Sequence, residues 1–172
     1  MAIDIIIYTL DLIGYNAPII LFFSSIFLLY KKNILLSLYI IGSILNLAIN
    51  NILKEIIKQP RPDEDIQIFN ASKMLNKRFG PDKYGMPSGH AQSVFFSTSF
   101  LFFALKNKYV SLVYFIVSLN SMYQRVKYKN HTVSQVIGGA AVGSISGYLF
   151  YLAAMSKLSG PLKLKMDDNA PL

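Results

Sequence analysis

Long apolar runs alternate with short polar stretches along this chain of 172 residues, and the length of the runs predicts membrane-spanning helices. A helix needs about 20 mainly apolar residues to cross the hydrocarbon core, with a usual range of about 17 to 25. Five segments qualify, the fourth being short but extendable at both ends. They cover about residues 13–30, 34–57, 88–105, 109–123 and 132–155. The pattern predicts an all-α fold, a polytopic membrane helical bundle.

The two ends of the chain differ from these spans. Residues 1–12 are apolar but lack a basic start and contain Asp4 and Asp11, so they do not resemble a cleavable signal peptide. An N-terminal interfacial helix is expected there. One membrane-embedded domain is predicted over residues 1–156, and the mixed charge and two prolines of residues 157–172 predict a flexible polar tail.

Three polar clusters interrupt the apolar pattern, each at the border of a predicted span. The first runs from Lys54 to Pro62, the second is Pro87–His90, and the third runs from Arg125 to His131. If each span crosses once, the end of the second, the start of the third and the turn between the fourth and fifth emerge on one side. The sequence therefore predicts that the clusters lie together, beside a polar loop at about residues 59–86 that is long enough to partly cover a site.

Composition supports the membrane assignment and narrows the chemistry. The chain is 53% hydrophobic and its mean hydropathy is +0.40. Its net charge of +8 would suit nucleic acid, but the Lys and Arg residues lie at segment ends and form no continuous basic face, so no nucleic-acid partner is expected. The absence of cysteine excludes a disulfide framework, a thiolate nucleophile and a cysteine-based zinc site.

The first cluster continues a polar stripe on the second predicted helix. Its members recur every four residues: Asn46, Asn50, Lys54 and Lys58. Pro60 would stop the helix and place Arg61 close enough to Lys54 for both to bind one phosphate. The alternative is structural, with the Asn side chains joining helices and the cations marking the membrane boundary.

The second cluster opens an apolar run. Ser88 suits a helix N-cap and Gly89 permits close backbone approach, so free amide groups could bind an anion that faces His90. The alternative is plain helix capping.

The third cluster carries the candidate nucleophile. His131 precedes the fifth predicted helix, whose positive dipole end attracts phosphate and disfavours imidazolium, which keeps the ring able to attack. Gln135 lies one turn later, where its amide oxygen could accept a hydrogen bond from the second ring nitrogen. Arg125 would bind the same phosphate. Alternatively, Arg125, Lys127 and Lys129 form an ordinary basic loop and His131 is an interfacial residue.

Together the clusters resemble the three-part signature of the type-2 phosphatidic acid phosphatase superfamily, Lys-x6-Arg-Pro, Pro-Ser-Gly-His and Ser-Arg-x5-His-x3-Asp. Here they read KEIIKQPRP from Lys54, PSGH from Pro87 and QRVKYKNHTVSQ from Gln124. Gln124 replaces the Ser of the signature, and Gln135 replaces the Asp that orients the nucleophilic His. The stretches GMPSGHAQ and HTVSQV resemble the dolichyl-diphosphate phosphatase branch, which carries Gln at the corresponding place.

The resemblance implies hydrolysis through a phosphohistidine. His131 would attack the terminal phosphorus, His90 would protonate the leaving group, and water would then release phosphate. Gln135 would hold the tautomer of His131 but, unlike a carboxylate, would not offset its developing charge. The residues that would bind the phosphate oxygens are Lys54, Arg61, Ser88, Gly89 and Arg125.

No cofactor is expected and no metal need be invoked. Two histidines and no cysteine cannot assemble a His-rich or thiolate metal site. Three consecutive acidic residues could recruit a hard cation only loosely: Asp63, Glu64 and Asp65.

The fifth predicted span carries a ridge of small residues, Gly139, Gly143 and Gly147. Such a ridge brings helices close together, and packing within the molecule is favoured over dimerisation. The phenylalanines at 95, 96, 100, 102 and 103 could line a lipid chain, but packed or lipid-facing positions are more typical.

Orientation is not fixed by charge, because the basic residues outside the clusters divide evenly between the two sides. The resemblance to the dolichyl-diphosphate branch implies the endoplasmic reticulum, with the active site facing the lumen and a polyprenyl diphosphate as substrate. Asn70-Ala71-Ser72 is a glycosylation sequon consistent with that orientation. The alternatives are a phosphatase for phosphatidate or undecaprenyl diphosphate, or a catalytically silent membrane scaffold.

Overall fold

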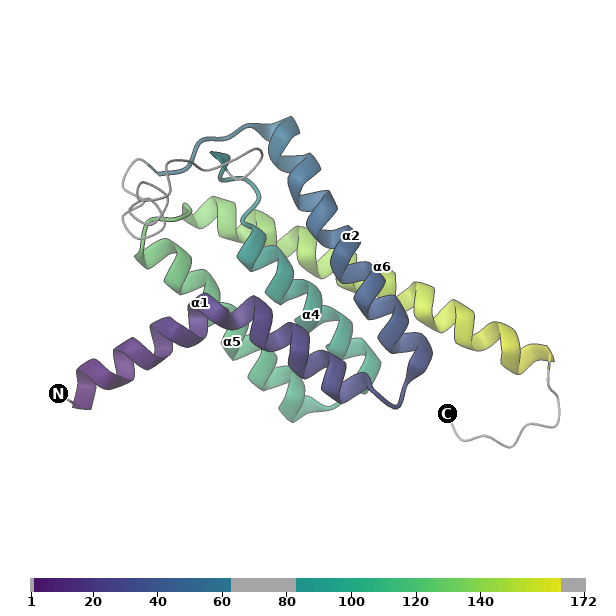
Figure 1. The fold of residues 1–172 in the computed structure, drawn as a ribbon. Helices are drawn as coiled ribbons and strands as arrows, with labels where there is room; N and C mark the ends of the chain where they lie inside the picture. Colours follow the sequence, from purple (N-terminus) through teal and green to yellow (C-terminus); the bar gives the residue numbers. More distant parts are fainter. Residues whose placement is uncertain (1, 63–82, 165–172) are drawn as a thin grey trace.

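In the computed structural model, residues 2–62 and 83–164 are described, and within them five helices form one bundle (Figure 1). The predicted all-α membrane bundle is confirmed. Its helices are α1 (Ala2–Leu29), α2 (Asn33–Ile57), α4 (Gly89–Leu105), α5 (Lys108–Lys127) and α6 (Val133–Leu164).

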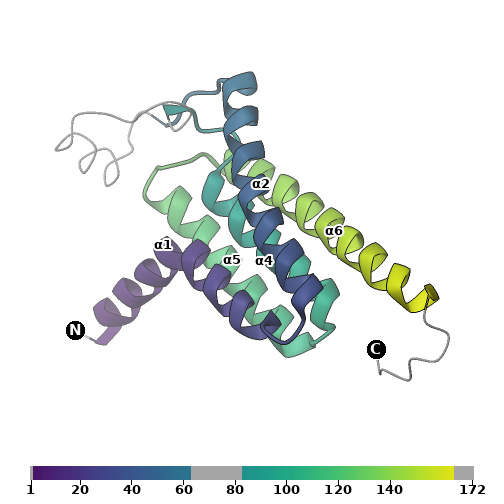
Figure 2. The same cartoon turned by 45° about the vertical axis from the view of Figure 1, so that its right-hand side comes forward.

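The first helix differs from the prediction. α1 is continuous from Ala2 to Leu29, so the expectation of a separate interfacial helix over residues 1–12 is wrong. No proline or glycine lies between residues 2 and 13, and nothing in the sequence ends the helix there. The helix instead bends along its length (Figures 1 and 2) and contains Pro18, which removes one backbone hydrogen bond and clashes with the preceding turn.

The last helix is also longer than predicted. α6 runs to Leu164, beyond the domain boundary expected at residue 156. Leu158 still packs against the hydrophobic core, and no glycine or proline lies between Gly147 and Gly160, so the chain has no reason to leave the helix at 156. Residues 165–172 of the expected tail lie outside the described residues.

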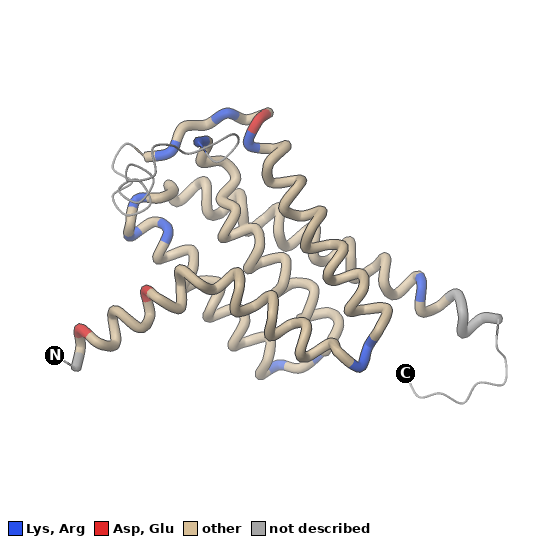
Figure 3. Tube along the Cα trace, viewed as in Figure 1, with Lys and Arg blue, Asp and Glu red and all other residues tan. Residues whose placement is uncertain are grey.

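Within the part of the chain that the structure describes, three helices are apolar and long enough to cross a membrane by length and composition. They cover Ile3–Leu29, Asn33–Ile57 and Val133–Ser159. Lys and Arg gather towards the ends of the bundle (Figure 3), and large apolar side chains such as Phe27, Ile44 and Ile145 are exposed on its outer faces. Charged ends and apolar flanks suit a protein surrounded by lipid.

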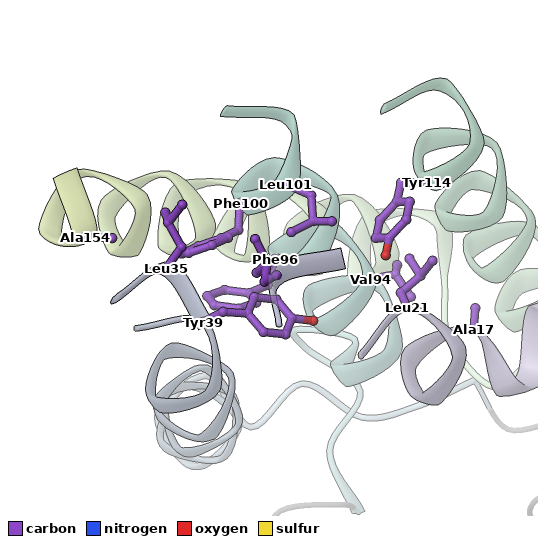
Figure 4. Packing of buried hydrophobic residues seen from close by; sticks show 11 residues of the cluster. Ala17, Leu21, Leu35, Tyr39, Val94, Phe96, Phe100, Leu101, Tyr114 and Ala154 are labelled. Carbon is purple, nitrogen blue, oxygen red and sulfur yellow. The ribbon is translucent and has the colours of Figure 1, made fainter. Parts of the chain in front are cut away.

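α4 lies at the centre of the bundle, where it contacts each of the other four helices of the described chain. Phe96 and Phe100 of α4 pack against Tyr39 of α2, with ring centroids 5.7 and 5.3 Å apart (Figure 4). Both phenylalanines are buried in the core. This is the packing role that the sequence favoured over a lipid-lining one.

The ridge of glycines on α6 packs against α4. A Cβ atom at Gly139 would overlap the carbonyl oxygen of Ser88, the N-cap of α4, and a Cβ atom at Gly143 or Gly147 would overlap that of Gln92 or Phe96 within α4. The ridge therefore lies inside the molecule, as predicted, and it fixes how closely the starts of α4 and α6 approach each other.

Candidate active site

The ends of α2 and α5 and the starts of α4 and α6 meet at one end of the bundle, and the three polar clusters meet with them. Ser88 N donates to Gln135 O at 3.0 Å, which joins the second cluster to α6. Arg61 Nη1 lies 3.2 Å from His131 Nε2, which joins the first cluster to the third. The convergence predicted from the order of the spans is confirmed.

His131 is held in one tautomer. Its ring is 3% exposed, with Nδ1 2.9 Å from the Gly85 carbonyl oxygen and Nε2 3.2 Å from the Arg61 guanidinium. Because a carbonyl only accepts and a guanidinium only donates, Nδ1 carries the proton and Nε2 keeps its lone pair. Nε2 is therefore the nitrogen that can act as a nucleophile.

Burial also keeps this ring neutral. Desolvation lowers the pKa of His131 well below its usual 6.5, and the nearby charges of Arg61, Lys54 and His90 lower it further, while the hydrogen bond to Gln135 opposes them. Neutral imidazole therefore persists at pH values below 6.5, where an exposed histidine would be mostly protonated.

This state predicts a specific spectrum. In ¹⁵N NMR of histidine-labelled protein in nanodiscs, we expect His131 to carry its proton on Nδ1 at pH 7 and to become imidazolium only below pH 6.5. His90→Gln assigns the signals, because the chain contains two histidines. A proton on Nε2, or titration at or above pH 6.5, would contradict the arrangement of donors and acceptors around the ring.

Gln135 connects three segments at the start of α6. Its Oε1 lies 3.3 Å from His131 Nδ1, which confirms the predicted hydrogen bond, although Gly85 is the shorter partner. Oε1 also accepts from Thr132 N at 3.1 Å, while Thr132 Oγ1 accepts from Gln135 N at 3.3 Å, a capping box. Its Nε2 donates to the Pro60 carbonyl at 2.8 Å. Gln135 thus fixes both the helix start and the ring beside it.

The polar stripe of α2 combines both functions that the sequence left open. Asn46 and Asn50 are bonded to Gln92 of α4, at 2.9 and 2.7 Å, so they do join helices. Lys54, one turn further, is 3% exposed in the last turn of α2 and acts electrostatically on His131. Lys58 is exposed and ends the helix in a left-handed conformation. Along one face of α2, the stripe therefore begins with residues that join helices and continues to a lysine beside His131.

Ser88 occupies the N-cap position of α4, as predicted, but its side chain makes no capping hydrogen bond, so the alternative of plain helix capping is not what this side chain does. Its buried Oγ has no partner within residues 2–62 and 83–164. Gly89 begins α4, and a Cβ there would lie 3.2 Å from Asn50 Oδ1. His90 follows on the same turn, with its ring centroid 6.1 Å from that of Tyr15.

Arg125 lies in the last turn of α5 and is 1% exposed. Its Nε donates to Gln124 Oε1 at 2.7 Å, so the Gln that departs from the family signature orients the guanidinium. Arg125 Nη2 is buried and has no partner among the described residues. A guanidinium oriented in this way presents one of its donors to a ligand.

The arrangement suits an anion with several oxygens. Lys54, Arg61 and Arg125 bring three positive charges to one end of the bundle, and buried donors on Ser88 and Arg125 lack a partner within residues 2–62 and 83–164. An unmatched buried donor costs free energy of about 1–3 kcal/mol, which a phosphate oxygen would recover. The described residues contain no group of three His, Cys, Asp or Glu side chains that could hold a metal.

Some site features gave no readable signal in the sequence. The Gly85 carbonyl that orients His131 is a backbone group, although a Cβ at Gly85 would overlap the Gln135 amide. Asn130 is 1% exposed, both polar atoms of its side chain lack a partner in the described part of the chain, and its carbonyl accepts from Arg61 at 3.1 Å. The segment containing Asp63, Glu64, Asp65 and the sequon at Asn70 lies outside the described residues.

These features define a class of membrane protein, a helical bundle that gathers cations and a neutral, tautomer-fixed imidazole at one end. The chain belongs to the PAP2 superfamily, whose family model matches residues 34–158. The resemblance inferred from the three clusters is therefore confirmed.

Several curated proteins are similar to this chain. Lipid phosphate phosphatase epsilon 2, chloroplastic, of Arabidopsis thaliana is 37% identical over 121 residues, which covers 66% of this chain and 37% of the relative. Dolichyldiphosphatase of Saccharomyces cerevisiae is 31% identical over 121 residues (64% and 48%). Dolichyldiphosphatase 1 of Mus musculus is 27% identical over 148 residues (77% and 58%). The chain thus spans less than two thirds of each relative, and no solved structure matches it.

Proposed function

We propose that this chain is an integral-membrane lipid phosphatase, a hydrolase that converts a polyprenyl (dolichyl-type) diphosphate to the monophosphate and inorganic phosphate. The observation that carries the proposal is the state of His131, whose Nε2 lone pair faces Arg61 while Nδ1–H is held by the Gly85 carbonyl. The dolichyldiphosphatases among the relatives support the choice of substrate.

In the first step, Nε2 of His131 forms a bond to the terminal phosphorus as the bond from that phosphorus to the bridging oxygen breaks. Arg61 exchanges its contact with Nε2 for a phosphoryl oxygen, and Lys54, Arg125, Ser88 and the Gly89 amide bind the remaining oxygens. The ring becomes cationic, and the Gly85 and Gln135 oxygens on Nδ1–H stabilise it as dipoles rather than as a charge.

The polyprenyl monophosphate leaves on the bridging oxygen. His90 can protonate it, but a phosphate with a second pKa of about 6 needs less help from an acid than an alcohol does. Water then attacks the phosphohistidine, phosphate departs, and the lone pair returns to Nε2. No step requires a change of tautomer at His131.

Substrate preference provides the direct test. The purified protein in nanodiscs is supplied with dolichyl diphosphate, undecaprenyl diphosphate and phosphatidate, and phosphate release is measured beside a His131→Asn control. We expect the highest kcat/KM for dolichyl diphosphate, with the monophosphate as product. A preference for phosphatidate would instead support the second candidate, a phosphatase like the lipid phosphate phosphatases among the relatives. If phosphate is released from none of the three lipids, the result would support the remaining alternative, a catalytically silent membrane scaffold.

Activity is expected to be independent of metal ions, because the cations of the site supply the positive charge that a metal would otherwise provide. Phosphate release should persist within about twofold in excess EDTA, compared with the same protein in chelator-free buffer. Loss of activity that added Mg²⁺ or Ca²⁺ restores would reverse this prediction.

The endoplasmic reticulum is the proposed location, with the site facing the lumen, as for the branch that the motifs resemble. Expression in a eukaryotic host tests the orientation, since lumenal exposure permits a glycan at Asn70. A glycan removed by Asn70→Gln supports it, whereas modification of residues 63–82 only by cytosolic reagents places the site on the other side.

A further inference from the structure

The N-terminal helix contacts the site although it lies outside the residues that match the family model. Asp11 Oδ2 accepts from Lys127 Nζ at 2.7 Å and from the Tyr128 hydroxyl. Asn120 Nδ2 donates to the Leu10 carbonyl at 2.8 Å. These contacts attach the first half of α1 to the end of α5 and to the turn that leads to the nucleophile.

One side chain of α1 reaches the site itself. The Tyr15 ring centroid is 5.1 Å from Cζ of Arg125, a cation–π contact. The centroids of Tyr15 and His90 are 6.1 Å apart, with the rings tilted by 47°. Tyr15 therefore touches two proposed site residues from two different clusters.

The surroundings of Arg125 explain why this contact matters. Gln124 holds Nε at 2.7 Å and Tyr15 lies against the guanidinium, while Nη2 has no partner among the described residues. Arg125 is 1% exposed and Tyr15 is 49% exposed. The ring thus lies against a buried guanidinium whose Nη2 has no partner among the described residues.

We propose that Tyr15 is a positioning residue for phosphate binding, which makes α1 part of the site. The expected effect on kcat/KM rests on the proposed function, whereas the expected effect on phosphate binding does not. Tyr15 holds the plane of Arg125 so that Nη2 points to the phosphate, and it keeps His90 on the same side of that phosphate. A tyrosine that merely anchors a helix at the membrane interface would affect stability and leave phosphate affinity unchanged.

The test compares Tyr15→Ala, Tyr15→Leu and Tyr15→Phe, with Tyr8→Ala as the control, because Tyr8 is 69% exposed on the same helix. Two quantities are measured on the full chain in detergent: the Kd of inorganic phosphate by calorimetry, and kcat/KM for dolichyl diphosphate. We expect Ala and Leu at position 15 to weaken phosphate binding and lower kcat/KM by about tenfold. Tyr15→Phe, which keeps the aromatic ring, should retain most of the phosphate affinity and most of kcat/KM.

Retention of the unmodified Kd by Tyr15→Leu, or an equal loss in Tyr8→Ala, overturns the inference. Tyr15→Leu keeps apolar bulk, so it remains informative if Tyr15→Ala does not fold. If the unmodified chain binds phosphate but hydrolyses no lipid, the proposed function fails while the Kd series still decides the role of Tyr15. If the unmodified chain binds no phosphate, both proposals fall.

Discussion

Replacing His131 with Ala is expected to abolish turnover while the protein remains folded. Removing a covalent nucleophile that acts together with its neighbours costs roughly 10⁴-fold or more in kcat. No other described side chain can take its place, since the second histidine, His90, lies in the first turn of α4 and is the proposed general acid. Phosphate release from dolichyl diphosphate in nanodiscs measures the effect.

His131→Asn is the sharper variant. The Asn side-chain amide nitrogen can replace Nδ1–H as donor to the Gly85 carbonyl, so the buried acceptor keeps a partner, but no atom replaces Nε2. We expect this variant to melt within a few degrees of the unmodified protein and to show no turnover. It should also fail to trap the acid-labile, alkali-stable phosphoryl group that rapid quenching recovers from the unmodified protein. Turnover in either variant would remove His131 as nucleophile.

Replacing Gly143 with Val is expected to have the largest effect on stability. The new Cβ would overlap the Gln92 carbonyl oxygen, and the Gln92 side chain is bonded to Asn46 and Asn50, so this turn of α4 cannot move away freely. Overpacking of this kind costs about 1–3 kcal/mol, occasionally more. The melting temperature in detergent should fall, and kcat with it, because α4 and α6 carry opposite sides of the site.

Ala141→Val is the matched control, since Ala141 is exposed on the same helix. It adds the same side chain and should change neither melting temperature nor kcat. Equal stability of the two variants would contradict the close α4–α6 contact. If Gly143→Val changes only the oligomeric state, the glycine ridge would instead serve dimerisation, the alternative that the sequence disfavoured.

Hydrophobic patterning predicted the helices well where sequence breakers mark their ends. α2 ends at Ile57, shortly before Pro60, and α4 begins beside Pro87-Ser88, as expected. The predicted bounds were wrong for the first and the last helix of the chain, α1 and α6. No helix-breaking residue separates Leu12 from Ile13, so α1 continues through them. α6 continues past residue 156 because Leu158 still packs against the core.

The candidate site was predictable as a set of residues but not as an arrangement. The four-residue recurrence along α2 and the single crossing of the membrane by each predicted span identified Lys54, Arg61 and His131. Both features can be recognised from the sequence alone. Ser88 was correctly placed at the N-cap, but the sequence could not show that its side chain makes no capping hydrogen bond, because the side chain of an N-cap residue can turn away from its own helix. Gln135 was recognised as a partner of His131, while its bond to Pro60 depends on where the other loop comes to lie.

The sequence by itself determined that polar clusters at span borders would meet on one side, and that a glycine face on the last helix would admit a close neighbour. Only the tertiary structure decided which nitrogen of His131 keeps its lone pair, and that Tyr15 would lie against Arg125. The physical reason is the range of the interactions. Periodicity and helix breaking act within a few residues, whereas a backbone carbonyl or an aromatic face acquires its function from a partner that the fold brings from far along the chain.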